Sequence, residues 1–253
     1  MAGKTIRDRA QALGLSTATA VSCADLAGRG WPDPQDTPQP ERDFFRLYAV
    51  AKSRAEGFRQ RVETFGARQR VQASTRPGNV KRLERIVEKY SVSLELPLDL
   101  LGGKAVVGSL RQMYEVALVV PEQFRVVAFR DRVLQPQKSG YRDLQFIVAV
   151  EGPGGPPHYA EFKVLHTLFD QMDGYEHHLY EIRRGLEARE QDRLREPQVG
   201  QGVGEEPGEH VGSPVLSTVE QLVLKELGET SRTLFARTWE LVQAQEQAPP
   251  SNP

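Results

Sequence analysis

The eight residues from Lys138 to Gln145, Lys-Ser-Gly-Tyr-Arg-Asp-Leu-Gln, gather charged, hydroxyl and aromatic side chains around one glycine. They join two strand-like runs, residues 125–134 and 141–150. Gly140 lets the backbone come close to a ligand because it has no side chain. Tyr141, which opens the second run, fits core packing when it is considered alone. The turn is therefore the first candidate ligand site.

Lys81, Arg85 and Lys89 follow one another at intervals of four residues in a short, highly charged segment. If the segment is helical, as its pattern predicts, the three cations share one face. Such a row faces either water, with Arg85 and Lys89 paired to Glu84 and Glu88, or phosphates. The spacing alone leaves both interpretations open.

Two carboxylates lie next to apolar runs. Asp99 stands just before Gly102-Gly103, where it could also be a turn or cap residue. Glu161 lies in the strand-like run 158–165, on the same face as Lys163 by strand alternation. That position also fits an ordinary solvent-facing residue.

His177 precedes Glu181 by four residues in a predicted helix that runs from residue 167 to about residue 193. The two side chains therefore share a face and could hydrogen-bond. His177 and His178 are a weak zinc pair, because adjacent helical residues point about 100° apart.

The elements that must position these side chains follow from the hydrophobic pattern. Residues 41–69 and 110–120 show apolar side chains at helical intervals. Strands are predicted over residues 125–134, 141–150 and 158–165, with hairpin-length connections. We therefore predict an α+β fold, with a mixed β-sheet of about five strands flanked by helices.

Composition divides the chain into four segments. Residues 1–39 form an N-terminal extension with a Pro- and Gly-rich linker, residues 40–193 the folded domain, and residues 194–214 a flexible linker. Residues 215–253 contain one more amphipathic helix and a Pro-rich tail that we expect to be disordered. That helix either covers its own core or binds a partner helix, as in a homo-oligomer.

The composition also excludes several classes of protein. A net charge of −1 gives no overall basic field that would recruit nucleic acid or a membrane surface. No apolar run approaches the ~18 to 20 residues that span a bilayer. The single cysteine, Cys23, rules out an intrachain disulfide and suits a reducing cytoplasm, where we expect it to fill apolar space. An organelle transit peptide in the N-terminal extension is the alternative location.

The turn at residues 138–141 resembles the Gly-Tyr signature of the RelA/SpoT alarmone synthetase family, a branch of the polymerase-β-like nucleotidyltransferases. Over residues 79–184, five elements follow one another in the order of that family: a basic segment, Asp-Leu-Leu-Gly-Gly-Lys, Lys-Ser-Gly-Tyr, Ala-Glu-Phe-Lys and a Glu-His helix. The resemblance implies the nucleotidyltransferase fold, here with N- and C-terminal helical extensions.

The resemblance also implies a role for each matching residue. Asp99 and Glu161 would hold Mg²⁺, Glu161 would take the proton of the acceptor hydroxyl, and Tyr141 would stack on the acceptor base. Phosphates would be bound by Lys81, Arg85, Lys89, Lys104 and Lys138, with support from Asp143, Lys163 and His177.

Several positions differ from the signature of the family. Asn79 stands where the family has Arg, and Arg85 where it usually has Ser. Lys104 replaces an Arg and so lacks the bidentate fork that suits phosphate. Asp143, Gln145 and Lys163 replace Ser or Thr, His and Gln, respectively. A Gly-Tyr-Arg-Asp turn resembles that of a divergent subgroup that includes toxin-like domains.

The function that this pattern predicts is a Mg²⁺-dependent pyrophosphokinase, which transfers diphosphate from ATP to a ribose hydroxyl of a purine nucleotide. One alternative is a toxin-like relative that modifies the 3′ end of tRNA, which the near-neutral charge does not favour. Another is a nucleotide-binding or interaction module that keeps the fold without the chemistry.

Overall fold

The computed structural model describes residues 5–84, 86, 96–153, 155–195 and 216–247. A five-stranded mixed sheet lies at the centre, in the strand order β1-β2-β5-β4-β3. Strands β2 and β5 are parallel, and every other neighbouring pair is antiparallel. The predicted α+β class and mixed sheet are therefore confirmed. The strands are β1 Gln72–Thr75, β2 Gly102–Val107, β3 Arg125–Asp131, β4 Leu144–Val150 and β5 His158–His166.

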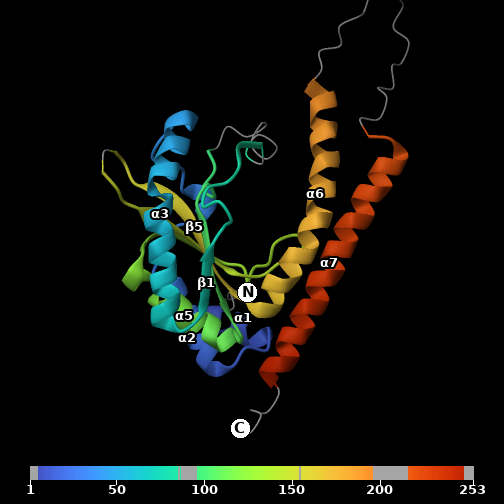
Figure 1. Cartoon of the computed structure of the whole chain (residues 1–253). Coiled ribbons are helices and arrows are strands. Elements are labelled where there is room, and N and C mark those ends of the chain that lie inside the picture. Colours follow the sequence, from blue (N-terminus) through green and yellow to red (C-terminus); the bar gives the residue numbers. More distant parts are fainter. Residues whose placement is uncertain (1–4, 85, 87–95, 154, 196–215, 248–253) are drawn as a thin grey trace, which may run out of the picture.

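Helices cover both faces of the sheet and form an arm beside it (Figure 1). Helices α3 and α5 pack on one face, and α6 packs on the other through β5 and β2. Helices α6 and α7 lie side by side and run in opposite directions. The helices are α1 Ile6–Ala12, α2 Thr17–Gly28, the short 3₁₀ helix Pro34–Asp36, α3 Phe44–Gln69, α5 Leu110–Gln123, α6 Thr167–Arg195 and α7 Thr218–Gln247.

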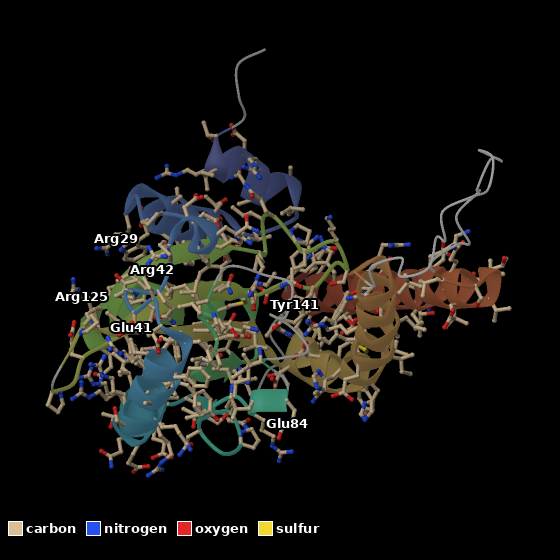
Figure 2. The ribbon with its side chains drawn as sticks, turned by 90° about the horizontal axis from the view of Figure 1, so that it is seen from above. Arg29, Glu41, Arg42, Glu84, Arg125 and Tyr141 are labelled. Carbon is tan, nitrogen blue, oxygen red and sulfur yellow. The ribbon has the colours of Figure 1, made fainter. Side chains whose placement is uncertain are left out.

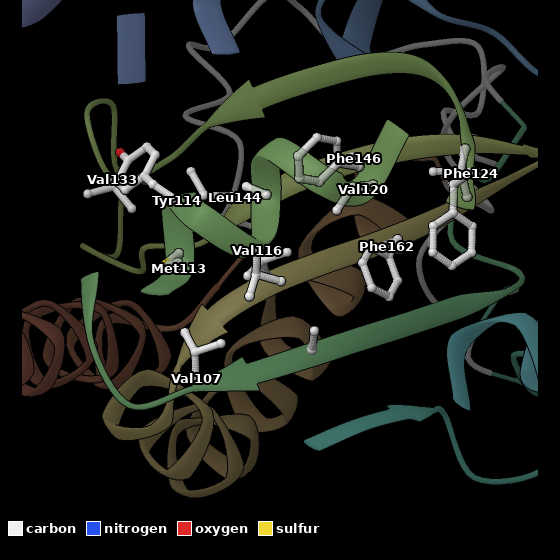
Figure 3. Packing of buried hydrophobic residues seen from close by; sticks show 14 of the residues in the cluster. Val107, Met113, Tyr114, Val116, Val120, Phe124, Val133, Leu144, Phe146 and Phe162 are labelled. Carbon is white, nitrogen blue, oxygen red and sulfur yellow. The ribbon is translucent and has the colours of Figure 1, made fainter. Parts of the chain in front are cut away.

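Strand alternation divides the side chains of β5 between the two faces. Phe162 points toward α3 and α5, where its ring stacks on Phe124 with centroids 4.9 Å apart (Figure 3). Gly103 faces the same way, because an added Cβ would lie 2.9 Å from Val62 of α3 and 3.2 Å from Phe162. Glu161 and Lys163 therefore point to the α6 face, as alternation predicts. The sheet thus has one apolar face and one face that carries charges.

The N-terminal segment packs on this core. Cys23 and Leu26 of α2 are each only 1% exposed, and α2 contacts α5. Trp31 packs edge-on against Phe129 with ring centroids 6.0 Å apart, and the N–H of Phe129 donates to the carbonyl of Pro32. Burial raises the pKa of Cys23 to about 12, in spite of a hydrogen bond with Tyr114. Cys23 is therefore an inert filler, as the sequence predicts.

Three local predictions need correction. Strand β3 ends at Asp131 rather than at residue 134, because the Asp131 carboxylate accepts hydrogen bonds from the N–H groups of Val133 and Leu134 and folds them into a turn. Strand β4 begins at Leu144, three residues later than predicted. Lys81 precedes the helical residues Leu83 and Glu84, so it does not continue a helical row.

No helix in the described part of the chain combines the length and the hydrophobicity that crossing a membrane requires. Of the two roles predicted for the C-terminal helix, packing on its own chain is the one seen. Helix α7 contacts α6 along its length, and Phe235 and Val242 are buried. Self-association through α7 stays a prediction, and the linker predicted at residues 194–214 lies almost entirely outside the described residues.

Candidate functional site

Two adjoining cavities open on the charged face of the sheet, beneath α6. The loop-side cavity, of about 620 Å³, is lined by Arg76 and Pro77, by residues 80–82 and by the middle of α6. The turn-side cavity, of about 280 Å³, is lined by the turn at residues 137–145 and by Phe235 of α7. Six residues line both cavities and so form their shared boundary: Asp99, Glu161, Lys163, Asp173, His177 and Tyr180.

The two carboxylates at this boundary are held by a rigid backbone. Asp99 comes directly before Leu100 and Leu101, which are fully buried. The carbonyl of Leu100 accepts from the N–H of Lys81 at 2.9 Å, and that of Leu101 accepts from the N–H of Glu161 at 3.0 Å. These bonds fix the loop that carries Lys81, the Asp99 loop and strand β5 to one another.

Each carboxylate is paired with a lysine. The Lys81 ammonium donates to Asp99 Oδ2 at 2.7 Å, and Lys163 Nζ lies 3.4 Å from Glu161 Oε2. Burial alone would raise the pKa of Glu161, as does the neighbouring charge of Asp99. Lys163, Arg132 and a hydrogen bond from Gln145 outweigh both effects and lower the pKa of Glu161 below its ordinary value. Glu161 is therefore ionised at neutral pH.

Three residues that differ from the synthetase signature belong to one network around Glu161. Asp143, which is fully buried, accepts from Arg132 through both oxygens at 2.5 and 2.8 Å, and Lys163 lies 3.9 Å away. Gln145 Nε2 donates to Glu161 Oε1 at 2.6 Å. Two cations, Arg132 and Lys163, thus balance the two carboxylates of Asp143 and Glu161. The replacements compensate one another in space, although they are scattered in the sequence.

Tyr141 lies where the sheet meets α6 and α7 (Figure 2). Its side chain lines the turn-side cavity but is only 4% exposed. Its ring packs edge-on against Phe235, with centroids 5.5 Å apart, and against Phe169, at 6.1 Å. The charged groups of Arg132 and Lys163 lie 5.8 and 5.7 Å from the ring centre. Little of the ring is open to a ligand.

Of the other predicted site residues, some line the cavities and some do not. His177 lines both cavities, and its Nε2 lies 3.1 Å from Glu181 Oε1, which confirms the predicted contact. Lys104 pairs instead with Asp170 of α6. Lys138 lines a separate groove between the turn and α7. Lys104 and Lys138 therefore line neither cavity, and Arg85 and Lys89 lie outside the described residues.

Among the residues of these cavities that sequence reasoning missed, three carry charges close to the two carboxylates. Asp173 precedes His177 by four residues, so helical spacing could have placed it on the same face. Burial raises the pKa of Asp173, and the nearby Lys163 only partly offsets this. Arg76 and Arg132 gave no such signal, because their positions depend on a four-residue strand and on the register of a hairpin.

No protein-family model matches the sequence, and no curated protein matches it. Among solved structures, the small alarmone synthetase 2 from Bacillus subtilis aligns with a TM-score of 0.51 and 17% sequence identity, over 81% of this chain and 100% of that one. The chain has the small alarmone synthetase fold. The expected resemblance is thereby confirmed at the level of the fold.

Further structures align less closely. A GTP pyrophosphokinase family protein from Streptococcus pneumoniae gives a TM-score of 0.43 at 17% identity, over 80% of this chain and 90% of that one. The small alarmone synthetase 1 from Bacillus subtilis, bound to its product pppGpp, gives 0.46 at 15% identity, over 82% and 100%.

Proposed function

We propose that this protein is a Mg²⁺-dependent nucleotide pyrophosphokinase, which transfers the β,γ-diphosphate of ATP to a ribose hydroxyl of a purine nucleotide. The observation that supports it best is the shared boundary of the two cavities. A transfer between two bound nucleotides needs two adjoining sites with the reacting groups where they meet. Asp99 and Glu161 line both cavities at that boundary.

The loop-side cavity is the proposed ATP site. It is lined by several cations, among them Lys81, Arg82 and Arg184. Positive side chains around a phosphate chain neutralise the charge that shifts during phosphoryl-type transfer. Lys104 and Lys138 line neither cavity, so we leave them out of the phosphate-binding set.

The donor atoms at the boundary suit a magnesium ion. Mg²⁺ prefers oxygen ligands and is usually bound by one or two carboxylates together with substrate phosphates. Among the described residues no group of three or more His, Cys, Asp or Glu is arranged to hold a metal. Asp99 and Glu161, each of which lies beside a lysine, are the residues that would hold it. When bound, Mg²⁺ would offset the negative charge of the phosphates during the transfer.

The transfer itself forms one bond and breaks one. The acceptor hydroxyl attacks the β-phosphorus of ATP, the bond from that phosphorus to the α-phosphate oxygen breaks, and AMP leaves. The hydroxyl proton passes to the Glu161 carboxylate. Lys163 and Gln145 hold this carboxylate in place, at 3.4 and 2.6 Å. Arg132 and Lys163 are fixed in turn by Asp143.

The turn-side cavity is the proposed acceptor site, with Tyr141 as the platform for the base. Phe235 packs against the Tyr141 ring, so stacking on Tyr141 requires Phe235 to move away. We therefore propose that the acceptor binds after, or together with, a displacement of α7 near this residue.

The test is to incubate the purified protein with γ-³²P-labelled ATP, Mg²⁺ and, separately, GDP, GTP, ADP and tRNA. A labelled nucleotide and AMP, both lost in Asp99→Asn and Glu161→Gln, would establish the transfer and identify the acceptor. Label on tRNA would support the tRNA-modifying alternative. Nucleotide binding without any labelled product would contradict the proposal and indicate a non-catalytic binding module.

A further inference from the structure

We infer that Arg76 binds the phosphate chain of the nucleoside triphosphate in the loop-side cavity, in place of the arginine that the synthetase signature has at position 79. The inference rests on the proposed function, because it gives a residue to the donor site. Arg76 lies at the end of β1 and lines this cavity, together with Lys81 and Arg82.

The backbone explains why Asn79 does not fill that role. Asn79 has a φ of 61°, and the preceding Gly78 a φ of 77°, so both are in the left-handed region that a tight turn requires. The N–H of Asn79 donates to the carbonyl of Arg76 at 3.0 Å, and its Oδ1 accepts from the Thr75 hydroxyl at 3.2 Å. Asn79 closes the turn through these bonds. The long cationic side chain of Arg76 reaches the cavity instead.

Arg76 is anchored beside the carboxylates. Its N–H donates to the carbonyl of Gly102 at 3.0 Å. Its guanidinium lies over Gly102, because an added Cβ there would come within 3.1 Å of Nη2 and 3.3 Å of Nε. Gly102 is the register partner of Glu161 on the neighbouring strand, and adjacent strands lie about 4.8 Å apart. The guanidinium is therefore beside the proposed point of transfer.

Arg76 differs from the nearby Lys81 and Lys163 because its side chain has no carboxylate partner among the described residues. Lys81 and Lys163 already face Asp99 and Glu161 at 2.7 and 3.4 Å. The buried Nε of Arg76 has no hydrogen-bond acceptor among the described residues, and no carboxylate there lies within ion-pair distance of its guanidinium. A buried N–H without an acceptor is destabilising, and a guanidinium binds phosphate oxygens through two parallel hydrogen bonds. A phosphate chain would supply those acceptors.

The cavity as a whole fits a polyanion. Five cationic side chains line it, against four carboxylates, among the described residues. The carboxylates that line it include Asp99 and Glu161, which are the proposed magnesium ligands. With about 620 Å³ the cavity also lies within the usual range of nucleotide-sized ligand sites. The ligand class is therefore a triphosphate bound with its metal, rather than a lone carboxylate or sulfate.

The experiment measures binding of inorganic triphosphate, at fixed Mg²⁺ and ionic strength, by isothermal titration calorimetry on the full chain. We expect Arg76→Gln to weaken binding about 10- to 100-fold, because charged hydrogen bonds are lost. Arg76→Lys keeps the charge without the fork and should recover part of the affinity. The control, Arg46→Gln, removes an exposed cation of α3 that lines neither cavity and should change affinity less than about threefold.

Equal affinity of Arg76→Gln and wild type, or equal losses in Arg76→Gln and Arg46→Gln, would overturn the inference. Thermal unfolding of each variant shows whether a loss reflects misfolding, and Arg76→Lys provides a second, conservative test. Pyrophosphate transfer is measured on the same preparations. If the wild type transfers pyrophosphate but Arg76→Gln binds triphosphate as tightly as the wild type, the role of Arg76 is wrong and the proposed function stands. If Arg76→Gln specifically loses triphosphate binding but the wild type transfers no pyrophosphate, the phosphate site stands and the proposed function is wrong.

Discussion

The loop-side and turn-side cavities share their carboxylates but differ in how they are built. The loop-side cavity is bounded by an exposed loop, and Arg76, Lys81 and Arg82 reach it from one side. The turn-side cavity is less than half as large, and Phe235 of α7, which lines it, packs against Tyr141. Gly140 shows how closely α7 approaches, because an added Cβ would lie 3.2 Å from the Cβ of Phe235. The cations of the loop-side cavity line its surface, whereas the Tyr141 ring of the turn-side cavity is covered by α7 in this conformation.

The physical reason for this difference is the type of contact that stabilises each region. The turn side is held by the buried Arg132–Asp143 pair and by the aromatic contacts of Tyr141. The buried hydrogen bond from Ser231 to Glu176, at 2.7 Å, ties α7 to α6 beside them. The loop side depends on a few backbone hydrogen bonds and on the Lys81–Asp99 pair. Changes at the two sides should therefore have different effects.

The largest effect is expected where the two cavities meet. Glu161→Gln keeps the shape of the side chain but removes the base, so AMP formation from ATP should fall about 10²- to 10⁴-fold. Glu181→Gln, which changes a carboxylate that lines only the loop-side cavity, is the matched control and should keep most of the activity. Equal activity of Glu161→Gln and wild type would remove Glu161 from the reaction.

The next test concerns the buried ion pair of the turn side. Asp143→Asn leaves the buried Arg132 without its ion-pair partner, so the free energy of unfolding should fall by about 3 to 5 kcal/mol. Glu151→Gln is the control: it breaks the exposed pair with Arg125 and should cost less than about 1 kcal/mol. Urea unfolding measures both. Similar losses in the two variants would contradict the view that the turn side depends on a buried pair.

Stability should also change with pH through Asp131, which lies at the end of β3 beside α5. Burial raises the pKa of Asp131 to about 6 from its ordinary 3.8, although the N–H groups of Leu134 and Val133 and the hydroxyl of Tyr114 favour its charged form. The native state therefore holds this proton more tightly than the unfolded chain does. The contribution of Asp131 to stability is present below pH 4 and is lost as the pH rises to 6.

Because one pKa unit corresponds to about 1.4 kcal/mol and the side chain is partly exposed, we expect a loss of roughly 2 kcal/mol between pH 4 and pH 6. Asp131→Asn should remove this part of the slope. Unfolding curves of both proteins at several pH values give the difference directly, since other titrating groups cancel. Parallel pH dependences would show that Asp131 titrates normally.

The smallest effect is expected from partial opening of the turn side. Phe235→Leu shortens the side chain that covers Tyr141 and loses an aromatic contact of about 1 kcal/mol. The KM for the acceptor nucleotide should fall about two- to fivefold, while triphosphate binding in the loop-side cavity should not change. Leu241→Ala, on an exposed part of α7, is the control. An unchanged KM for the acceptor would mean that Phe235 does not limit access to Tyr141.

Much of the fold could be predicted from the sequence, because hydrophobic periodicity marks long elements clearly. The helix predicted over residues 41–69 is α3, Phe44–Gln69, and the run 158–165 is β5, His158–His166. Short elements were missed or misjudged for a physical reason. Strand β1 has only four residues, and the end of β3 depends on the side-chain hydrogen bonds of Asp131. Periodicity over a few residues contains too little information to find such features.

The sequence by itself determined the residue types of the site, the class of fold and the face on which Glu161 and Lys163 lie, since all of these follow from local pattern. Only the tertiary structure decided which charges meet. Arg132 and Asp143 pair because β3 and β4 form a hairpin in one register. Phe235, nearly a hundred residues from Tyr141 in the chain, covers its ring because α7 folds back on α6. Contacts between distant segments depend on the packing of whole elements, and no spacing within one segment encodes them.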